Sequence, residues 1–540
     1  MADPLARLHR EITAAADTLR EGTYGGAEIG LERPPRDDLG DYSTNAAMLL
    51  APGRDEPPRD VAELLKDELG RRLGDSVERL EVAGPGFLNL SLAPSWYRTT
   101  VGELLDAGES LQPDAPREPE RVLVEFVSAN PTGPLTAAGG RHAAYGDSVA
   151  RLLQFAGHQV EREYYVNDVG GQVDRLAASV SALMRGDQPP EDGYRGDYVG
   201  ELAEELTREG LDPQDAAELS RASAEQIVSS IKATLERFGV EFDTWFSERS
   251  LHDAGSVDRV VEDLLERDAA YESEGATWLR TSAFGDDKDR VLVRSGGEPT
   301  YFAADVAYHR DKLERGAGRM LDVLGADHHG YVARMRAAIE ALGTDPTRYE
   351  VVIMQLVHLV DSGERAQMSK RKGEFVTLDE LVDDIGVDAA RFFMLQRSHD
   401  TTVDLDLALA RRQSSDNPVY YVQYAHARLC SILRLAGMDS GGRPQAGAGD
   451  VGTEPAERAL VRRLLEFPGE AAAAAERRAP HRLCSYAMAT AADVHAFYRD
   501  CKVVGAEPAV EAARLEVCVA ARRIIARSLE LLGVSAPESM

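Results

Sequence analysis

Two lysines stand close together in a chain that otherwise takes its positive charge from arginine. Lys370 and Lys372 lie in the segment GERAQMSKRKGEF (363–375), and they are two of only seven lysines among 540 residues. The segment is bounded by glycines, contains a serine and follows the strand-like run VVIMQLVHLV. Lysine acts toward phosphate groups as a mobile point charge. The pattern favours a loop that meets a polyphosphate over a solvated run of charge.

A second candidate for phosphate binding is the loop SANPTGPLTAAGG (128–140). It lies between the apolar run RVLVEFV (121–127) and an amphipathic helical pattern that stops at Gly157. Such a loop presents backbone N–H groups and the positive end of a helix dipole, which suits a phosphate. Its glycines do not match G-x-G-x-x-G, and it has no Walker A lysine. From the loop alone, nucleotide binding and a mere tight turn remain equally open.

Tyr301 and Asp305 are four residues apart in the helix-like stretch TYFAADVAYH, so they share one helix face. Spacing alone favours a core tyrosine beside an exposed aspartate, and it treats Glu125 as a glutamate at a strand end. His328 and His329 follow another strand-like run without a third ligand at metal-binding spacing. We therefore expect no metal held by protein side chains.

Composition limits the class of protein. The net charge is −31, and an acidic surface repels nucleic acid at ordinary salt. Acidity combined with so little lysine, however, resembles adaptation to a very salty cytoplasm, where the Debye length falls to about 3 Å and local patches decide RNA binding. The chain has no run of about 18 apolar residues and no signal peptide, so we expect a soluble cytoplasmic protein without membrane contact. The four cysteines lack CxxC spacing and are expected to be reduced, structural thiols.

The elements that must position these residues follow from periodicity. Helical patterns and a strand pair broken at 84–86 predict a small α/β N-terminal domain (1–112), followed by a Pro-rich linker. A β–loop–α–β unit over 121–166 opens a Rossmann-like, parallel-sheet catalytic domain (118–404). We expect a helical insertion at about 170–290, after which strand-like runs return: DRVLVRS, MLDVLGA and EVVIMQLVHLV. Residues 405–540 predict an α-helical bundle whose apolar spacing indicates a core. The fold class is thus multidomain α/β plus α.

These segments together resemble one family. QMSKR (367–371) resembles the K-M-S-K-R signature of class I aminoacyl-tRNA synthetases, with Gln in the first position, and VEFVSANPTGPL (124–135) resembles the segment before the other signature in arginyl-tRNA synthetases. The similarity continues in order through most of the chain, in GDYSTNAAMLLA, GPGFLNLSL, EREYYVNDVGGQ, RFGVEFDTWFSERSL, PTYFAADVAYH, GADHHGY and SAPESM. The sequence is similar to arginyl-tRNA synthetases.

The resemblance implies ATP-dependent ligation of L-arginine to tRNA(Arg) through an arginyl-adenylate, as used in translation, with Mg²⁺ carried by ATP. It makes Lys370 and Ser369 the catalytic residues. The residues expected at ATP are Pro134, Thr136, Gly139, Gly140, His142, Met368 and Lys370. Those expected at arginine are Glu125, Ser128, Asn130, Tyr301, Asp305 and His328, because a guanidinium seeks carboxylates.

The resemblance also assigns the RNA contacts. The N-terminal domain would contact the tRNA elbow, and the bundle, an anticodon-binding domain, would read the anticodon. Tyr420, Tyr421 and Tyr498 could stack on unpaired bases, although core packing suits each of them equally. The paired arginines of the bundle are expected on solvated helix faces: Arg411-Arg412, Arg462-Arg463, Arg477-Arg478 and Arg522-Arg523. Residue patterns say nothing of oligomeric state, and a monomer is the working expectation.

One departure from the family pattern matters. H-x-G-H normally follows Gly-Pro-Leu, but residues 136–139 here read TAAG, so both phosphate-contacting histidines are missing. His142 could compensate, or backbone N–H groups and Lys370 could suffice. Some members instead carry a lysine just before the first signature; that position is Gly133, while Lys370 is retained. The alternatives are a non-catalytic tRNA-binding paralogue and a class I ligase for another amino acid.

Overall fold

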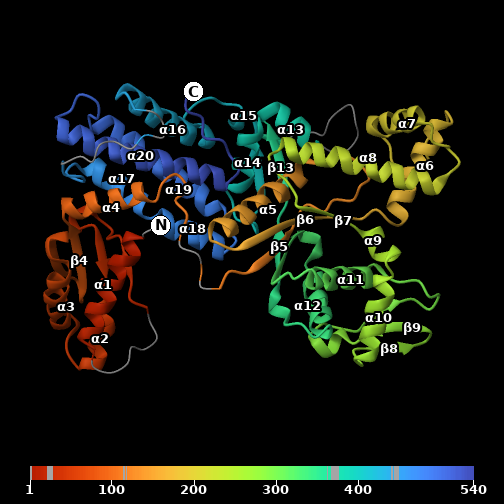
Figure 1. Ribbon diagram of the computed structural model, residues 1–540, viewed down its shortest axis with the longest axis horizontal. Coiled ribbons are helices and arrows are strands. Elements are labelled where there is room, and N and C mark those ends of the chain that lie inside the picture. Colours follow the sequence, from red (N-terminus) through yellow and green to blue (C-terminus); the bar gives the residue numbers. More distant parts are fainter. Residues whose placement is uncertain are drawn as a thin grey trace.

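The structure is a computed structural model. It describes residues 3–20, 28–113, 116, 118–361, 363–365, 376–438, 442 and 449–540. The N-terminal domain and the C-terminal bundle lie together at one end of the molecule, and the catalytic domain extends from them (Figure 1). Within the described residues, none of the helices combines the length and apolar character needed to cross a bilayer.

The N-terminal domain packs helices against an antiparallel sheet of order β1-β2-β4-β3. The strand pair predicted around 84–86 is present as β3 and β4. Gly86 is required there, because a Cβ would lie 2.7 Å from Pro58 Cβ. The elements of the domain are α1 (Pro4–Thr18), β1 (Leu31–Glu32), β2 (Tyr42–Thr44), α2 (Ala46–Arg54), α3 (Pro58–Leu73), β3 (Val77–Ala83), β4 (Phe87–Leu92) and α4 (Pro94–Asp106).

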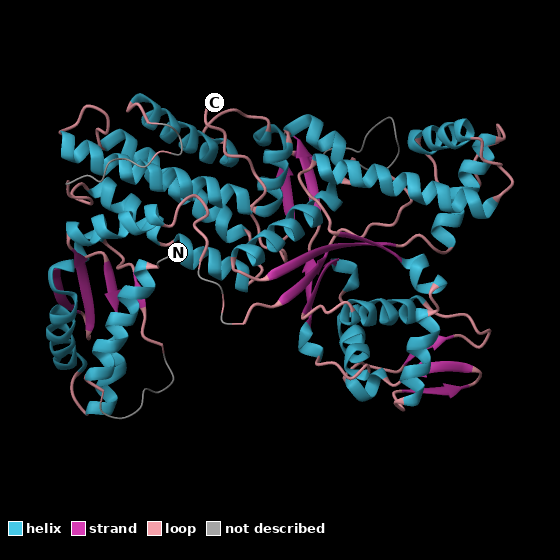
Figure 2. Ribbon diagram, viewed as in Figure 1, coloured by secondary structure: helices cyan, strands magenta, loops and turns pink. Residues whose placement is uncertain are grey.

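A five-stranded parallel sheet of order β12-β11-β5-β6-β7 forms the centre of the catalytic domain. Val122 and Val124 of β5 belong to the core shared with α5, whereas Leu123 joins a second core with α11 and α12. The sheet is therefore covered on both faces, as a continuous apolar strand predicts (Figure 2). The elements are β5 (Arg121–Glu125), α5 (Ala137–Phe155), β6 (Gln159–Val166), β7 (Thr244–Ser247), α11 (Tyr301–Glu314), β11 (Arg319–Gly325), α12 (Tyr331–Ala341) and β12 (Tyr349–Met354).

The expected helical insertion at 170–290 is only partly helical. Strand β7 lies inside this range and pairs in parallel with β6. The end of the range folds into a small antiparallel sheet, and the expected strand DRVLVRS belongs to it rather than to the central sheet. Its first hairpin turns at Glu274-Gly275, both with positive φ (52° and 76°), a turn that acidic composition concealed. The elements are α6 (Gly171–Met184), α7 (Asp197–Glu209), α8 (Ala216–Arg237), α9 (Glu248–Asp253), α10 (Ser256–Glu266), β8 (Ala270–Ser273), β9 (Ala276–Leu279) and β10 (Arg290–Val293).

The apolar run EVVIMQLVHLV is not one strand. It breaks at Gln355-Leu356, whose carbonyls accept hydrogen bonds from Arg141 Nη1 at 2.7 and 3.4 Å. Arg141 is 1% exposed and also donates to the carbonyls of Ser398 and Thr401. The second half of the run enters a third sheet, of order β14-β13-β15. The elements here are β13 (Val357–Asp361), β14 (Glu364–Arg365), α13 (Leu378–Ile385), α14 (Val387–Leu395) and β15 (Val403–Asp406).

The C-terminal part is helical, as its periodicity predicts. Leu483, Tyr486, Thr490 and Phe497 are all buried in the bundle core. The four cysteines are buried and unpaired. The helices are α15 (Leu407–Ala410), α16 (Pro418–Leu435), α17 (Pro455–Leu465), α18 (Phe467–Glu476), α19 (His481–Asp500) and α20 (Pro508–Leu531).

Most paired arginines of the bundle do not lie on solvated faces. Arg522 and Arg523, which are 7% and 6% exposed, donate to Glu109 Oε1 at 2.7 and 2.9 Å. Arg462 is also buried and lies 3.6 Å from Asp41 of the N-terminal domain. Carboxylates of the N-terminal domain neutralise these cations. The arginines therefore connect domains and are not free to contact RNA phosphates. Arg478 is half-buried and pairs with Glu350 of the catalytic domain. Arg411 pairs with Asp361 and Asp384 but stays exposed, as predicted.

Arg391 joins three parts of the chain at one point. It is fully buried and contacts Asp147 of α5 at 2.5 Å, the Leu532 carbonyl after α20 at 3.0 Å and the Phe238 carbonyl after α8 at 3.2 Å. Gly533 permits this contact, since a Cβ there would lie 2.0 Å from the guanidinium. A cavity of about 620 Å³ lies beside this junction, at the end of α5 remote from its N-terminus.

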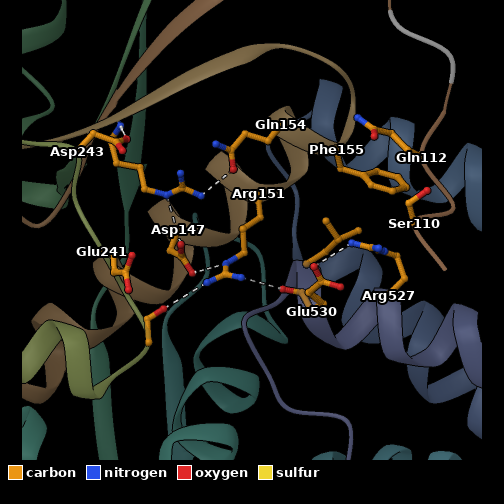
Figure 3. Close-up of a pocket in the computed structure, with 13 residues that line it drawn as sticks. Ser110, Gln112, Asp147, Arg151, Gln154, Phe155, Glu241, Asp243, Arg527 and Glu530 are labelled. Carbon is orange, nitrogen blue, oxygen red and sulfur yellow. Dashed lines mark hydrogen bonds and ion pairs between the residues drawn. The ribbon is translucent and has the colours of Figure 1, made fainter. Parts of the chain in front are cut away.

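Charged side chains that line this cavity form ion pairs with each other. Figure 3 shows Arg151 beside Asp147 and Arg527 beside Glu530, pairs separated by 2.7 and 2.9 Å. The cavity is thus a polar gap where the N-terminal domain, the catalytic domain and the bundle meet.

Arg391→Met is expected to lower the midpoint of thermal unfolding by about 5–10 °C, because it leaves buried carbonyls unpaired and removes a cation from Asp147. Differential scanning calorimetry measures this. The matched control is Arg477→Met at an exposed position, for which little change is expected. A shift for Arg391→Met no larger than the control's would contradict the role of the junction.

Candidate active site

The order of the parallel strands locates the site. The chain runs from β5 through β6 to β7 on one side of the sheet, and β11 and β12 then add on the other side of β5. Ligands of such sheets bind beyond the carboxyl ends of the strands, where the order reverses. This point lies between β5 and β11, and the N-terminus of α5 and the start of α11 border it. Every described residue expected at arginine lies on these elements or on the loops that follow β5 and β11.

Three carboxylates stand side by side on neighbouring strands just below this edge. Asp322 of β11 pairs in register with Glu125 of β5, which pairs in turn with Glu163 of β6. Their exposures are 3%, 8% and 0%. We call these three residues the acid row. At the strand spacing of about 4.8 Å, neighbouring ionised carboxylates repel by about 3 kcal/mol at an effective dielectric constant of 20, so the row requires cations.

Helix α11 supplies the cations. Lys312 Nζ, which is fully buried, contacts Glu125 Oε2 at 2.5 Å and Asp322 Oδ1 at 3.0 Å. Arg315, at the C-cap of α11, contacts both oxygens of Glu163 at 2.8 and 3.0 Å.

Two further α11 residues reach the row. The ring nitrogens of His309 face the Asp305 carbonyl at 2.8 Å and Asp322 Oδ2 at 3.1 Å. The Tyr308 hydroxyl lies 2.6 Å from Glu163 and 2.9 Å from Glu125.

Protonation within the row reflects burial and pairing. Burial alone would lower the pKa of Lys312, but Asp322 and Glu125 outweigh it and raise that pKa above its usual value. For Asp322, the opposing pull of Lys312 and His309 exceeds the effect of burial, and its pKa falls. Burial raises the pKa of Glu125 although Lys312 opposes the change. Because the ammonium of Lys312 already contacts Glu125, a guanidinium must find its main carboxylate elsewhere.

Asp305 and Glu248 are two further carboxylates near the carboxyl ends of the strands, and Glu248 Oε1 lies 3.7 Å from His252 Nε2. Burial, reinforced by Glu125 and Asp322, raises the pKa of Asp305 to about 6. Burial, reinforced by Asp305 and Asp168, raises the pKa of Glu248 to about 7. Because the charge of Asp305 contributes to the raised pKa of Glu248, a cation bound between the two carboxyls would favour the ionised form of both. Sequence reasoning missed Glu248; its position in FSERSL, directly after β7, was the available signal.

Tyr301 lies one helical turn before Asp305 on α11. It is 62% exposed, yet a Cβ on Gly170 would lie 3.1 Å from its hydroxyl oxygen. The ring therefore spans from α11 to the loop after β6. Gly170 also has a φ of +93°, which favours glycine. Tyr301 and Asp305 share one helix face, as predicted from their spacing.

The loop after β5 is strained where it turns toward the pocket. Val127 and Ser128 have φ values of +69° and +39°, which are uncommon for residues with a Cβ. The turn lets Ser128 Oγ donate to Glu125 Oε1 at 2.9 Å and accept from the Tyr165 amide at 3.1 Å. Asn130 is exposed and donates to Gln172 at 3.0 Å. His328 is exposed after β11, with Nε2 3.6 Å from Asp327.

On the phosphate side, residues 135–137 and 376–378 pair with each other. The Ala137 amide donates to the Val376 carbonyl at 2.9 Å, and the Leu378 amide donates to the Leu135 carbonyl at 2.8 Å. A bridge joins Thr136 to Thr377. The structure thus brings the chain that follows GERAQMSKRKGEF to the start of α5. Met368, Ser369 and Lys370 themselves lie outside the described residues.

The expected free amides at this helix start are largely engaged. Gly139 N donates to Thr136 Oγ1 at 3.2 Å, and Gly140 N donates to the Thr136 carbonyl at 3.2 Å. The two glycines serve packing, since Cβ atoms would lie 2.6 Å from Leu135 and from Leu378. Pro134, also expected at ATP, precedes them in the half-buried part of the loop.

His142 does not replace the missing charge. Burial lowers its pKa to about 4, and it is hydrogen-bonded to the Val323 backbone of β11. The ring is therefore neutral and attached to the sheet.

Comparisons with known proteins agree across the whole chain. Three family models match: the arginyl tRNA synthetase N terminal domain (6–92), the catalytic domain of tRNA synthetases class I (R) (100–190 and 206–413) and the DALR anticodon binding domain (422–540). An arginine–tRNA ligase of Desulfitobacterium hafniense is 46% identical over 94% of this chain and 93% of its own length. One from Heliobacterium modesticaldum is 42% identical over 99% of both chains.

A solved structure gives the same result. Arginyl-tRNA synthetase from Thermus thermophilus superposes with a TM-score of 0.77 at 25% identity, and the match covers both chains entirely. The chain belongs to the arginyl-tRNA synthetase family of class I aminoacyl-tRNA synthetases.

Proposed function

We propose that this protein ligates L-arginine to tRNA(Arg) through an arginyl-adenylate, using ATP. The observation that carries the proposal is the pair of carboxylates Asp305, near the start of α11, and Glu248, directly after β7: burial raises the pKa of both, and the charge of Asp305 adds to the shift of Glu248. A guanidinium is a planar cation that carboxylates bind well. The relatives at 42–46% identity carry the name arginine–tRNA ligase, and the chain spans nearly their full length.

In this proposal, each part of the pocket holds one part of arginine. Asp305 and Glu248 bind the guanidinium, and Tyr301 covers it. Ser128, Asn130 and His328 lie nearer the sheet edge and hold the polar end of the amino acid. Glu125 does not bind arginine directly in this proposal. It fixes the side chain of Ser128 by accepting the 2.9 Å hydrogen bond from Ser128 Oγ.

The chemistry needs no protein nucleophile. The arginine carboxylate attacks the α-phosphorus of ATP in line, and pyrophosphate leaves. The terminal ribose hydroxyl of tRNA then attacks the adenylate carbonyl, and AMP leaves. Because the amides of residues 137, 139 and 140 are engaged and His142 is neutral, we assign the phosphate contacts to Met368, Ser369 and Lys370. Mg²⁺, carried by ATP, supplies further charge neutralisation, and the protein contributes positioning and electrostatic stabilisation.

Two surfaces support an RNA partner. Phe87, which is 38% exposed, lies beside Asn89 in a hollow of about 560 Å³ in the N-terminal domain. In the bundle, Arg428 lies over the rings of Tyr424 and Tyr498 at 4.6 and 4.2 Å, and Tyr498 is 49% exposed. Exposed aromatic rings next to amides or guanidinium groups suit unpaired bases. Tyr421 packs against His495 instead.

A non-catalytic relative would not need to keep the acidic pocket, and nothing favours that alternative. The acidity and scarcity of lysine support an enzyme that works in concentrated salt, while a cytoplasmic location and a monomeric state stay predictions. Exchange and binding should therefore be measured in high potassium chloride.

Lys370→Ala is expected to slow adenylate formation by about 10²–10³-fold, because it removes a cation from the developing charge on the phosphates. Arginine-dependent ATP–pyrophosphate exchange, with tRNA present, measures the rate. Lys502→Ala, an exposed lysine of the bundle, is the control and should match wild type. Equal rates for Lys370→Ala and wild type would refute the assignment.

Asp305→Asn is expected to raise the KM for arginine by about 10²-fold while the KM for ATP changes less than about threefold, because a charge-assisted contact is lost only to arginine. Asp268→Asn provides the control, since that side chain is 92% exposed. If both KM values rise together, Asp305 does not belong to the arginine pocket.

Arginine affinity should increase with pH between about 5.5 and 8. In the free protein Asp305 and Glu248 have pKa values of about 6 and 7, and the guanidinium, which stays charged, binds their ionised forms. Protonation at low pH therefore competes with arginine, and deprotonation removes the competition. Equilibrium dialysis with labelled arginine gives Kd at each pH, and Asp305→Asn should show a shallower dependence. A Kd that stays constant over this range argues against the pair.

A further inference from the structure

We propose that Lys312 is a positioning residue for arginine: by joining α11 to the acid row, it sets where Asp305 and Tyr301 meet the substrate. The inference rests on the proposed function, because it takes Asp305 as the guanidinium partner. Lys312 touches no substrate in this proposal and acts entirely through the helix that carries the pocket.

The first observation is that Lys312 is fully buried and that its ammonium is paired with two carboxylates. It is one of seven lysines in the chain, and it is 0% exposed. Its ammonium contacts carboxylates on two different strands, β5 and β11, at 2.5 and 3.0 Å. It also lies 4.4 Å from the centre of the Tyr308 ring. A lone buried ammonium between two strands fixes the helix against both of them at once.

The second observation is what else lies on that face of α11. Residues 301, 305, 308 and 312 follow the spacing i, i+4, i+7 and i+11, so they form one stripe along the helix. The N-terminal end of the stripe is the pocket, and its C-terminal end is the contact with the row. A helix of 14 residues transmits displacement along its length, so the anchored end determines the place of the pocket end.

The third observation is that the row cannot tolerate the loss of its cation. Asp322 and Glu125 are directly paired on adjacent strands, and removing Lys312 leaves two buried carboxylates facing each other. They can relax by taking up a proton or by moving apart. Moving apart displaces α11, and Asp305 shifts with it. The defect would then appear in arginine binding and not in ATP binding, because the ATP side lies on α5 and residues 376–378.

The test compares four proteins by pyrophosphate exchange with tRNA at high salt: wild type, Lys312→Met, Lys232→Met and Lys312→Met/Asp322→Asn. Methionine keeps an unbranched apolar side chain, one atom shorter than that of lysine, and removes the charge. Lys232 is exposed on α8 and controls for the loss of one lysine charge. The double variant keeps the summed charge of the row and removes the unpaired repulsion.

We expect Lys312→Met to raise the KM for arginine at least 30-fold, with the KM for ATP within threefold of wild type and Lys232→Met unchanged. In the double variant, the KM for arginine should be at least tenfold lower than in Lys312→Met. If the single variant does not fold, a double variant with an arginine KM within threefold of wild type supports the inference, because the charge balance is then what matters.

Three results would overturn the inference: an unchanged arginine KM in Lys312→Met, a parallel rise in both KM values, or a double variant no better than the single one. A failure of the proposed function can be told apart from these results, because the wild-type protein would then show no arginine-dependent exchange.

Discussion

Burial of three carboxylates in one row is the constraint on which the catalytic domain depends. Asp322, Glu125 and Glu163 lie in register across β11, β5 and β6, where apolar side chains would be the ordinary choice. Their counter-charges come from α11 and its C-cap, through Lys312 and Arg315. A buried ion pair contributes little net stability compared with an apolar core, but breaking one is costly. The row therefore specifies where α11 lies more than it stabilises the fold.

Buried arginines likewise connect separate segments within the catalytic domain and attach the bundle to the other domains. Arg141 meets four carbonyls, Arg391 connects α14 to the ends of α8 and α20, and Arg522 and Arg523 attach the bundle to Glu109. Arginine suits these positions because its five donors can reach several acceptors at once. The preference of this chain for arginine over lysine thus appears in its interior as well as in its overall composition. Lys312 is the exception, and it occupies a position where a compact ammonium lies between two strands.

Sequence patterns predicted what is periodic and local. The strand pair at 84–86, the unit β5–α5–β6 and the helices of the bundle follow from alternation, apolar runs and helical spacing, and the structure contains them. The hairpin of β8 and β9 was missed because its strands have four residues each, and the break at Gln355-Leu356 was missed because its cause, Arg141, is 214 residues away. The pocket shows the same division: the spacing of Tyr301 and Asp305 gave their shared face, whereas Glu248 and Lys312 become meaningful only through non-local contacts.

The acid row and α11 also share a common repeat. Neighbouring strands are about 4.8 Å apart, and three residues of an α-helix rise about 4.5 Å. His309, Lys312 and Arg315 are each three residues apart, and they meet Asp322, Glu125 and Glu163 in the same order in which the strands lie. Helix α11 therefore crosses the sheet from β11 toward β6, and Lys312 contacts both β11 and β5 on the way. Inserting or deleting a single residue between Asp305 and Arg315 would rotate the following bases by about 100° and put them out of step with every strand, so this stretch should resist changes of length that a surface helix accepts.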